Sequence, residues 1–145
     1  MIFRQGQVAD IPGAFCICIF SQAQDYHIRI PGGDEMDNWS YVEDVASALA
    51  AAVLAPRLPE RHIFNVGGDY RSRREFGEYL QQLVPEARVD IEPGQQVEYR
   101  PRHVNDNIGE ALGFVPEWSM ERGVKATVNA ARERAGLSQV NQDGV

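Results

Sequence analysis

Apolar positions along this chain recur in two spacings, one typical of strands and the other typical of helices. Short alternating or apolar runs predict strands over 1–5, 26–30, 38–42, 62–66 and within 85–93. Gly-rich segments at 31–34 and 67–71 are typical of turns. The chain therefore alternates between strands and helices, which is the pattern of an α/β fold.

The clearest helix is predicted over residues 43–55, which are rich in alanine. Val45, Leu49, Ala52 and Val53 fall on one stripe, as in a helix that packs against a core. The acidic pair at its start, Glu43 and Asp44, is typical either of capping or of the rim of a site. Because a carboxylate in the first turn interacts favourably with helix amides, we interpret Asp44 as structural.

Capping signals place the remaining helices. Ser72 and Glu75 form a capping box ahead of a helix over 76–84. Gly113 ends a short helix that begins near residue 105, and a last helix runs from Ser119 to Gly136. Pro12 suits the first turn of a further helix within 12–24. Residues 136–145 are expected to form a flexible tail.

Charge restricts the classes of ligand. The 145 residues carry 14 basic and 21 acidic side chains, a net charge of −7. A negative field disfavours nucleic acid and anionic membranes as partners. The longest uncharged run, residues 11–24, is too short to span a bilayer, and no secretory signal opens the chain, so we expect a cytoplasmic protein.

No self-contained catalytic constellation is present in the sequence. Nucleophile-elbow and zinc-protease motifs are absent, and Lys125 is the only lysine, without the preceding glycine of a phosphate-binding loop. The three histidines suit packed or surface positions. Cys16 and Cys18 are separated by one residue within an apolar run, which favours reduced core thiols over a metal or redox site.

Two segments leave a binding role open. Gly67 and Gly68 lie between a predicted strand and a helix, where backbone amides can hold phosphate, but Asp69 follows and the dinucleotide fingerprint is absent, which favours a structural turn. Arg100 and Arg102 flank a proline in an irregular segment. Guanidinium groups there suit bidentate capture of phosphate or carboxylate, and a solvated loop is the alternative.

Three pieces in order resemble the C-terminal half of the NAD-dependent epimerase/dehydratase family, the extended short-chain dehydrogenases that act mostly on nucleotide sugars. The pieces are NWSYVEDVASAL, HIFNVGGDYRSRREFGEYL and NDNIGEALGFVPEWSMERGV. The resemblance covers roughly residues 1–135, with 136–145 as a tail. It implies a partial Rossmann-type sheet edge plus a small substrate-binding lobe, with the N-terminal dinucleotide-binding half missing.

The resemblance also implies what the chain lacks. The family binds NAD or NADP through a glycine-rich loop and transfers hydride with a Tyr-x-x-x-Lys pair, and neither motif occurs in this sequence. We therefore expect no cofactor for this chain alone, and NAD or NADP in the full-length enzyme. The chain would need the missing half as a partner, or form a homodimer to cover exposed apolar surface.

Six residues are the substrate-binding positions that the resemblance implies: Gln7, Val8, Arg29, Tyr41, Arg100 and Arg102. The substrate would be a small molecule, with a nucleotide sugar as the first choice. Asp37 departs from the family pattern, because it stands where a phosphate-binding arginine is often found. The alternative is a stand-alone, non-catalytic module that binds a sugar nucleotide or a protein.

Overall fold

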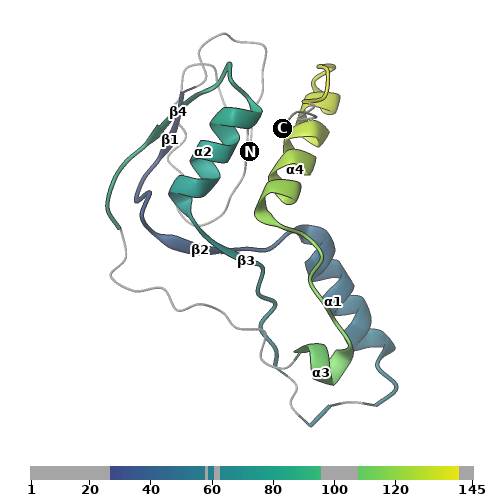
Figure 1. Ribbon diagram of the computed structural model, residues 1–145. Helices are drawn as coiled ribbons and strands as arrows, with labels where there is room; N and C mark the ends of the chain where they lie inside the picture. The colour runs from purple at the N-terminus through teal and green to yellow at the C-terminus, as the bar shows by residue number, and fades with distance from the viewer. Residues whose placement is uncertain (1–26, 58, 61–62, 96–107, 141–145) are drawn as a thin grey trace.

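The computed structural model describes residues 27–57, 59–60, 63–95 and 108–140 (Figure 1). The described part contains short strands and four helices in alternation, which confirms the predicted α/β class. Its elements are β1 His27–Ile30, β2 Met36–Trp39, α1 Val42–Leu54, β3 Asp69–Ser72, α2 Arg73–Leu83, β4 Arg88–Ile91, α3 Ile108–Leu112 and α4 Met120–Arg134.

The strands pair two by two. β1 and β4 are parallel, with His27 opposite Arg88 and Ile30 opposite Ile91. β2 and β3 are antiparallel and run into α1 and α2, respectively. Helix α2 lies close against the parallel pair because of Gly77, where a Cβ would come within 2.8 Å of side chains on both strands.

The larger core lies between α2, α4 and the parallel pair. Phe76, Leu80 and Leu83 recur on one face of α2, and Met120, Val124 and Val128 recur on one face of α4. Ile30 on β1 closes this core, and Trp39 on β2 stacks on Phe76 with ring centroids 4.5 Å apart. The helices α2 and α4 lie side by side in Figure 1.

A smaller core lies at the other end of the molecule, beside α1 and α3 (Figure 1). Ala48, Ile108 and Phe114 are buried there, and the partly buried Phe64 and Val66 pack against them. The two cores share no residue. Helix α1 therefore extends away from the α2–α4 pair.

The predicted capping signals of α2, α3 and α4 are confirmed. Ser72 accepts a hydrogen bond from the Glu75 amide, and the Glu75 carboxylate accepts one from the Ser72 amide, so both halves of the capping box form. Ser119 caps α4 by accepting from the Arg122 amide. Gly113 and Gly136 follow α3 and α4 with φ near +70°, a conformation in which glycine avoids the steric cost of a Cβ.

Three predictions around β2 and β3 are wrong in detail. The strand expected over 38–42 lies at Met36–Trp39, because the chain turns at Tyr41 to start α1. The turn expected over 67–71 is mostly β3, whose pairing with β2 brings Gly68 against the Trp39 carbonyl, 1.9 Å from where a Cβ would lie. Within the described residues 63–66 no strand forms, although Phe64 and Val66 face inward and Ile63 faces outward as in a strand.

The apolar stripe predicted for α1 does not face the core. Val45, Leu49 and Val53 are exposed, and the helix is buried instead along Asp44 and Ala48. The reason is that α1 carries small alanines on its opposite side, and these allow α3 and the chain around Phe114 to approach closely. The hydrophobic stripe of the sequence is therefore the outer surface of the helix.

Part of the predicted tail is hydrogen-bonded to α4. The Val140 amide donates to Asn129 Oδ1 at 2.8 Å, and Val140 also packs against the larger core. The strand expected at 1–5, the helix expected within 12–24 and both cysteines lie outside the described residues. Within the described ranges, no helix is both long and apolar enough to cross a membrane.

Replacing Leu80 with alanine tests the larger core. Leu80 is almost fully buried between α2 and α4, so we expect Leu80→Ala to lower the free energy of unfolding by about 2–5 kcal/mol. Leu54→Ala makes the same chemical change at an exposed position at the end of α1, and we expect little effect. Urea unfolding followed by circular dichroism compares the two variants, and equal losses would contradict the described packing.

The capping box predicts that the stability of the fold depends on pH. Hydrogen bonds from Ser72 to the Glu75 carboxylate lower the pKa of Glu75 below its ordinary value of 4.5. Because the folded-state pKa is the lower one, this carboxylate stabilises the fold above pH 4.5, and the contribution is lost as the pH falls through the folded pKa. Glu75→Gln keeps a hydrogen-bond acceptor but cannot titrate. We expect the melting temperature of this variant to depend less on pH below 4.5 than that of the unchanged chain, as measured by thermal unfolding over a series of pH values.

Candidate functional site

Two of the six predicted site residues lie in the described part of the chain. Arg29 is on β1, and Tyr41 is the residue just before α1. Gln7, Val8, Arg100 and Arg102 lie outside the described residues. The structure thus places two predicted positions on separate elements, each with its own set of contacts.

Arg29 forms a surface ion pair. Its guanidinium donates to Glu92, which follows β4, and about half of the side chain is exposed. On the same pair of strands, His27 of β1 pairs with Asp90 of β4, and Arg88 also contacts Asp90. Exposed ion pairs contribute little to stability, so a phosphate or carboxylate ligand could replace Glu92 as the partner of Arg29 at small cost.

Tyr41 belongs to a stack of three planar groups. Its ring lies 4.1 Å from the Trp118 ring, centroid to centroid, and the Arg122 guanidinium covers Trp118 at 3.8 Å. Gly123 leaves room for Tyr41, because a Cβ there would lie 3.0 Å from the tyrosine ring. The start of α1 is therefore held against the start of α4 by ring stacking and a cation–π contact.

A hollow of about 220 Å³ opens beside Tyr41. Three aromatic rings from β2, the start of α1 and α2 line it, and hydroxyl groups and glycine line the side toward α4. No charged side chain is among its lining residues in the described chain. The lining residues are the aromatic Trp39, Tyr41 and Phe76, the apolar Val42, Met120 and Val124, the glycine Gly123, and Ser40, Ser119 and Thr127 with aliphatic hydroxyls.

The hydroxyls of the hollow already have partners. Thr127 donates to the Gly123 carbonyl at 2.8 Å, Ser40 donates to the Val66 carbonyl at 3.4 Å, and Ser119 caps α4. The hollow therefore offers mainly aromatic and other apolar side chains. Such a surface suits the flat or apolar side of an uncharged ring and does not suit a phosphate.

Asp44 is structural, as predicted, but its partners are not those expected. Its buried carboxylate accepts hydrogen bonds from the backbone amides of Glu117 at 2.9 Å and Trp118 at 3.2 Å. These residues are 73 and 74 positions away along the chain. Asp44 thus fixes the segment that presents Trp118 to Tyr41.

Asp37 is also withdrawn from solvent. Its carboxylate lies 2.8 Å from Nε of Arg73, whose guanidinium is also 3.1 Å from Glu35. All three side chains are buried. The acidic group at the position where the family often has an arginine is therefore part of an internal ion cluster, which limits its repulsion of a bound anion.

Sequence reasoning missed two groups near the hollow. Trp118 carried no signal beyond an aromatic residue before a helix cap. Arg71 contacts Asp69, Glu75 and Glu121, and thereby joins β3, α2 and α4. These carboxylates raise the pKa of Arg71, with Glu121 as the main cause. A regular i, i+4 spacing reveals only the pair with Glu75.

The Gly67–Gly68 segment makes a close structural contact, because Gly68 packs against the Trp39 backbone. The described ranges contain no group of three or more His, Cys, Asp or Glu side chains that could hold a metal ion.

Comparison with known proteins gives the relatives of the chain. No family model matches it. The sequence is 31% identical over 107 residues to dTDP-glucose 4,6-dehydratase 1 of Escherichia coli K12, a match that covers 66% of this chain and 29% of the dehydratase. The chain thus spans less than a third of the length of this curated relative.

Solved structures show the same fold over about three quarters of this chain. One is UDP-glucuronic acid 4-epimerase from Bacillus cereus in complex with UDP-glucuronic acid and NAD (TM-score 0.61, 18% identity, 74% of this chain and 35% of the epimerase). Another is RMD from Pseudomonas aeruginosa complexed with NADPH (TM-score 0.61, 20% identity, 74% of this chain and 36% of that one). The Rossmann-type neighbours therefore match over about a third of their own length.

Removing the Asp44 carboxylate tests how the stack is held. Asp44→Ala removes the acceptor of two part-buried amide hydrogen bonds, so we expect the free energy of unfolding to fall by about 1–3 kcal/mol. Glu43→Ala removes the neighbouring carboxylate, which is exposed, and should change little. Near-ultraviolet circular dichroism should report loss of the Tyr41–Trp118 stack in the first variant alone. An unchanged aromatic signal in Asp44→Ala would contradict this role.

Proposed function

Part of this chain is related to the NAD-dependent epimerase/dehydratase family, and from that relationship we propose that it is the substrate-binding portion of such an enzyme. The whole enzyme would be an NAD(P)-dependent nucleotide-sugar epimerase or dehydratase, or a related reductase. The observation that carries the proposal is the match to dTDP-glucose 4,6-dehydratase over 107 residues.

The proposed division between a substrate-binding and a cofactor-binding portion follows from two motifs that the sequence lacks. Its 145 residues include neither G-x-G-x-x-G nor a tyrosine followed four positions later by lysine. NAD or NADP and the proton-transferring pair would therefore be supplied by a cofactor-binding portion outside this chain. This chain would bind and orient the substrate, and by itself would not turn it over.

We assign the substrate contacts to Gln7, Val8, Arg29, Tyr41, Arg100 and Arg102, within a lobe that comprises residues 1–135. Residues 136–145 would follow the lobe as a tail, in which the Val140 amide is hydrogen-bonded to Asn129 of α4. A nucleotide sugar suits these groups because arginines can pair with its phosphates, and the uncharged hollow at Tyr41 can accept one of its rings. The neighbour solved with UDP-glucuronic acid and NAD supports this class of substrate.

Calorimetric titration tests substrate binding. We expect dTDP-glucose or UDP-glucuronic acid to give a saturable heat with this chain. Arg29→Ala should weaken binding about tenfold, because a phosphate loses one charged partner. Arg88→Ala, on the adjacent strand and more exposed, is the matched control and should bind as the unchanged chain does.

Two outcomes would count against the proposal. A folded chain that gives no heat with any nucleotide sugar would contradict substrate binding, and a stand-alone module that binds another protein would then be the better interpretation. Binding of NAD or hydride transfer by this chain alone would contradict the division between two portions. Titration with NAD and NADP under the same conditions measures the second outcome.

A further inference from the structure

Within the described ranges, every exposed large apolar side chain lies at one end of the molecule. This end is the smaller-core unit, which comprises α1, α3, residues 63–66 and the chain around Phe114 (Figure 1). Seven such side chains are 37% to 83% exposed there, whereas the described part of the larger-core unit has none. Apolar side chains gathered on one unit are typical of a protein interaction surface. The seven are Val42, Val45, Leu49, Val53, Leu54, Ile63 and Val115.

The outer side of α1 is defined here by Val45, Leu49 and Val53. They follow one another at intervals of four residues and therefore lie within an arc of about 80° around the helix. Val42, in the first turn, lines the hollow at Tyr41 and is not part of this definition. From residue 45 to residue 56 the chain carries no charged side chain. The outer side of α1 therefore lacks the charges that a helix normally presents to water.

Helix α1 is apolar on its inner side as well. Ala48 is buried in the smaller core, and Ala51 packs against that core. A helix that is apolar all round is typical of the interior of a larger body. The smaller core contains three buried apolar residues, compared with nine in the larger core, so this unit provides a layer on one side of α1 only. The other side requires a layer from elsewhere.

The relatives indicate what supplies the second layer. The match to dTDP-glucose 4,6-dehydratase 1 covers 29% of that protein, and the match to RMD covers 36% of that chain. Most of each relative therefore lies outside the match. A portion of that size has to contact the part that this chain resembles if the two are to form one compact protein. In the proposed function, that portion binds the cofactor.

We propose that the outer side of α1 is the surface on which the cofactor-binding portion docks. The inference rests on the proposed function, from which it takes the existence of that portion. The partner surface is apolar and uncharged, because a charge that faced Leu49 would be buried without a counter-ion. Docking buries Leu49 and Val53 and leaves Arg29, on β1 of the larger-core unit, outside the contact.

Thiol labelling in a chimera tests the proposal. The chimera is dTDP-glucose 4,6-dehydratase 1 of Escherichia coli K12 in which this chain replaces the segment that it matches. In a Cys16→Ser, Cys18→Ser background, Leu49→Cys should react with iodoacetamide at least about tenfold more slowly in the chimera than in this chain alone, because docking covers position 49. Glu78→Cys, at an exposed position of α2, is the control and should react equally fast in both proteins. Mass spectrometry of the labelled peptides separates these thiols from those of the dehydratase.

A charge on the outer side of α1 tests the chemistry of the contact. We expect the unchanged chimera to melt in one transition. Leu49→Glu should split it into two, because the carboxylate is buried without a partner unless the two portions separate. Gln82→Glu adds the same charge at an exposed position of α2 and should preserve the single transition. Circular dichroism of this chain alone should be the same for both variants, since both positions are exposed in it.

Equal labelling rates of Leu49→Cys in the chimera and in this chain alone would overturn the proposal. So would a Leu49→Glu chimera that melts as the Gln82→Glu chimera does. A chimera that does not fold, although this chain and the dehydratase each fold, also contradicts a fit between the two surfaces.

Calorimetry of this chain alone with dTDP-glucose tests the proposed function independently. Heat of binding without protection of position 49 contradicts the docking surface alone. Protection of position 49 without heat of binding contradicts substrate binding alone.

Discussion

The buried guanidinium of Arg73 determines how the loop after β1, β2 and α2 meet. It lies between the Glu35 and Asp37 carboxylates and also donates to the Pro31 carbonyl at 3.0 Å. A charge in a protein interior is tolerated only when it is well paired, so these groups must be placed together. The backbone follows the same geometry, since the amides of Arg73 and Arg74 donate to carbonyls of Glu35 and Gly33. Phe76, in the first turn of α2, is thereby brought onto Trp39.

Local signals in this sequence predicted local structure well. The capping box at Ser72 and Glu75 and the glycine ends of α3 and α4 depend on residues within one turn of each other, which a sequence window contains. Asp37, Asp44 and Arg71 also have distant partners, which are Arg73, Trp118 and Glu121. These lie 36 to 74 positions away, and no spacing rule reaches them. The carboxylates that seemed relevant to a site were thus interpreted from their residue type alone, and their internal pairing became apparent only in three dimensions.

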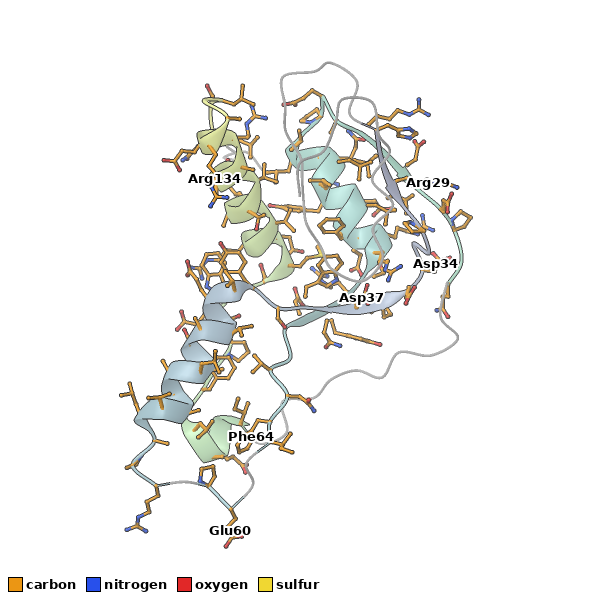
Figure 2. All side chains as sticks on the ribbon, turned by 180° about the vertical axis from the view of Figure 1, so that it is seen from behind. Arg29, Asp34, Asp37, Glu60, Phe64 and Arg134 are labelled. Atoms are coloured by element: carbon orange, nitrogen blue, oxygen red, sulfur yellow. The ribbon has the colours of Figure 1, made fainter. Side chains whose placement is uncertain are left out.

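Helix α1 shows a different limit of sequence patterns. One side carries large aliphatic residues and the other carries alanines, so both are apolar, and periodicity cannot tell which side is buried. Close packing favoured the side with small residues, where α3 and Phe114 approach. The segment at Phe64 and Val66 had the alternation of a strand, and Phe64 lies beside α3 in Figure 2, yet a strand also needs a neighbour that the pattern does not specify. In the same view Arg29 lies toward the opposite end of the molecule from Phe64, and Asp37 lies between them.

The positions of the two tryptophans have an optical consequence. Of the two tryptophans, Trp39 stacks on Phe76 in the larger core, whereas Trp118 lies between Tyr41 and Arg122 where α1 joins the remainder of the fold. The indole of Trp118 lies against a tyrosine ring and a guanidinium, whereas that of Trp39 stacks on Phe76 and donates to the Arg71 carbonyl at 3.1 Å, so their excited states have different surroundings. A chain with a single remaining indole would emit from one region only. Intrinsic fluorescence could then follow the larger core and the junction of α1 with α4 separately, without any added label.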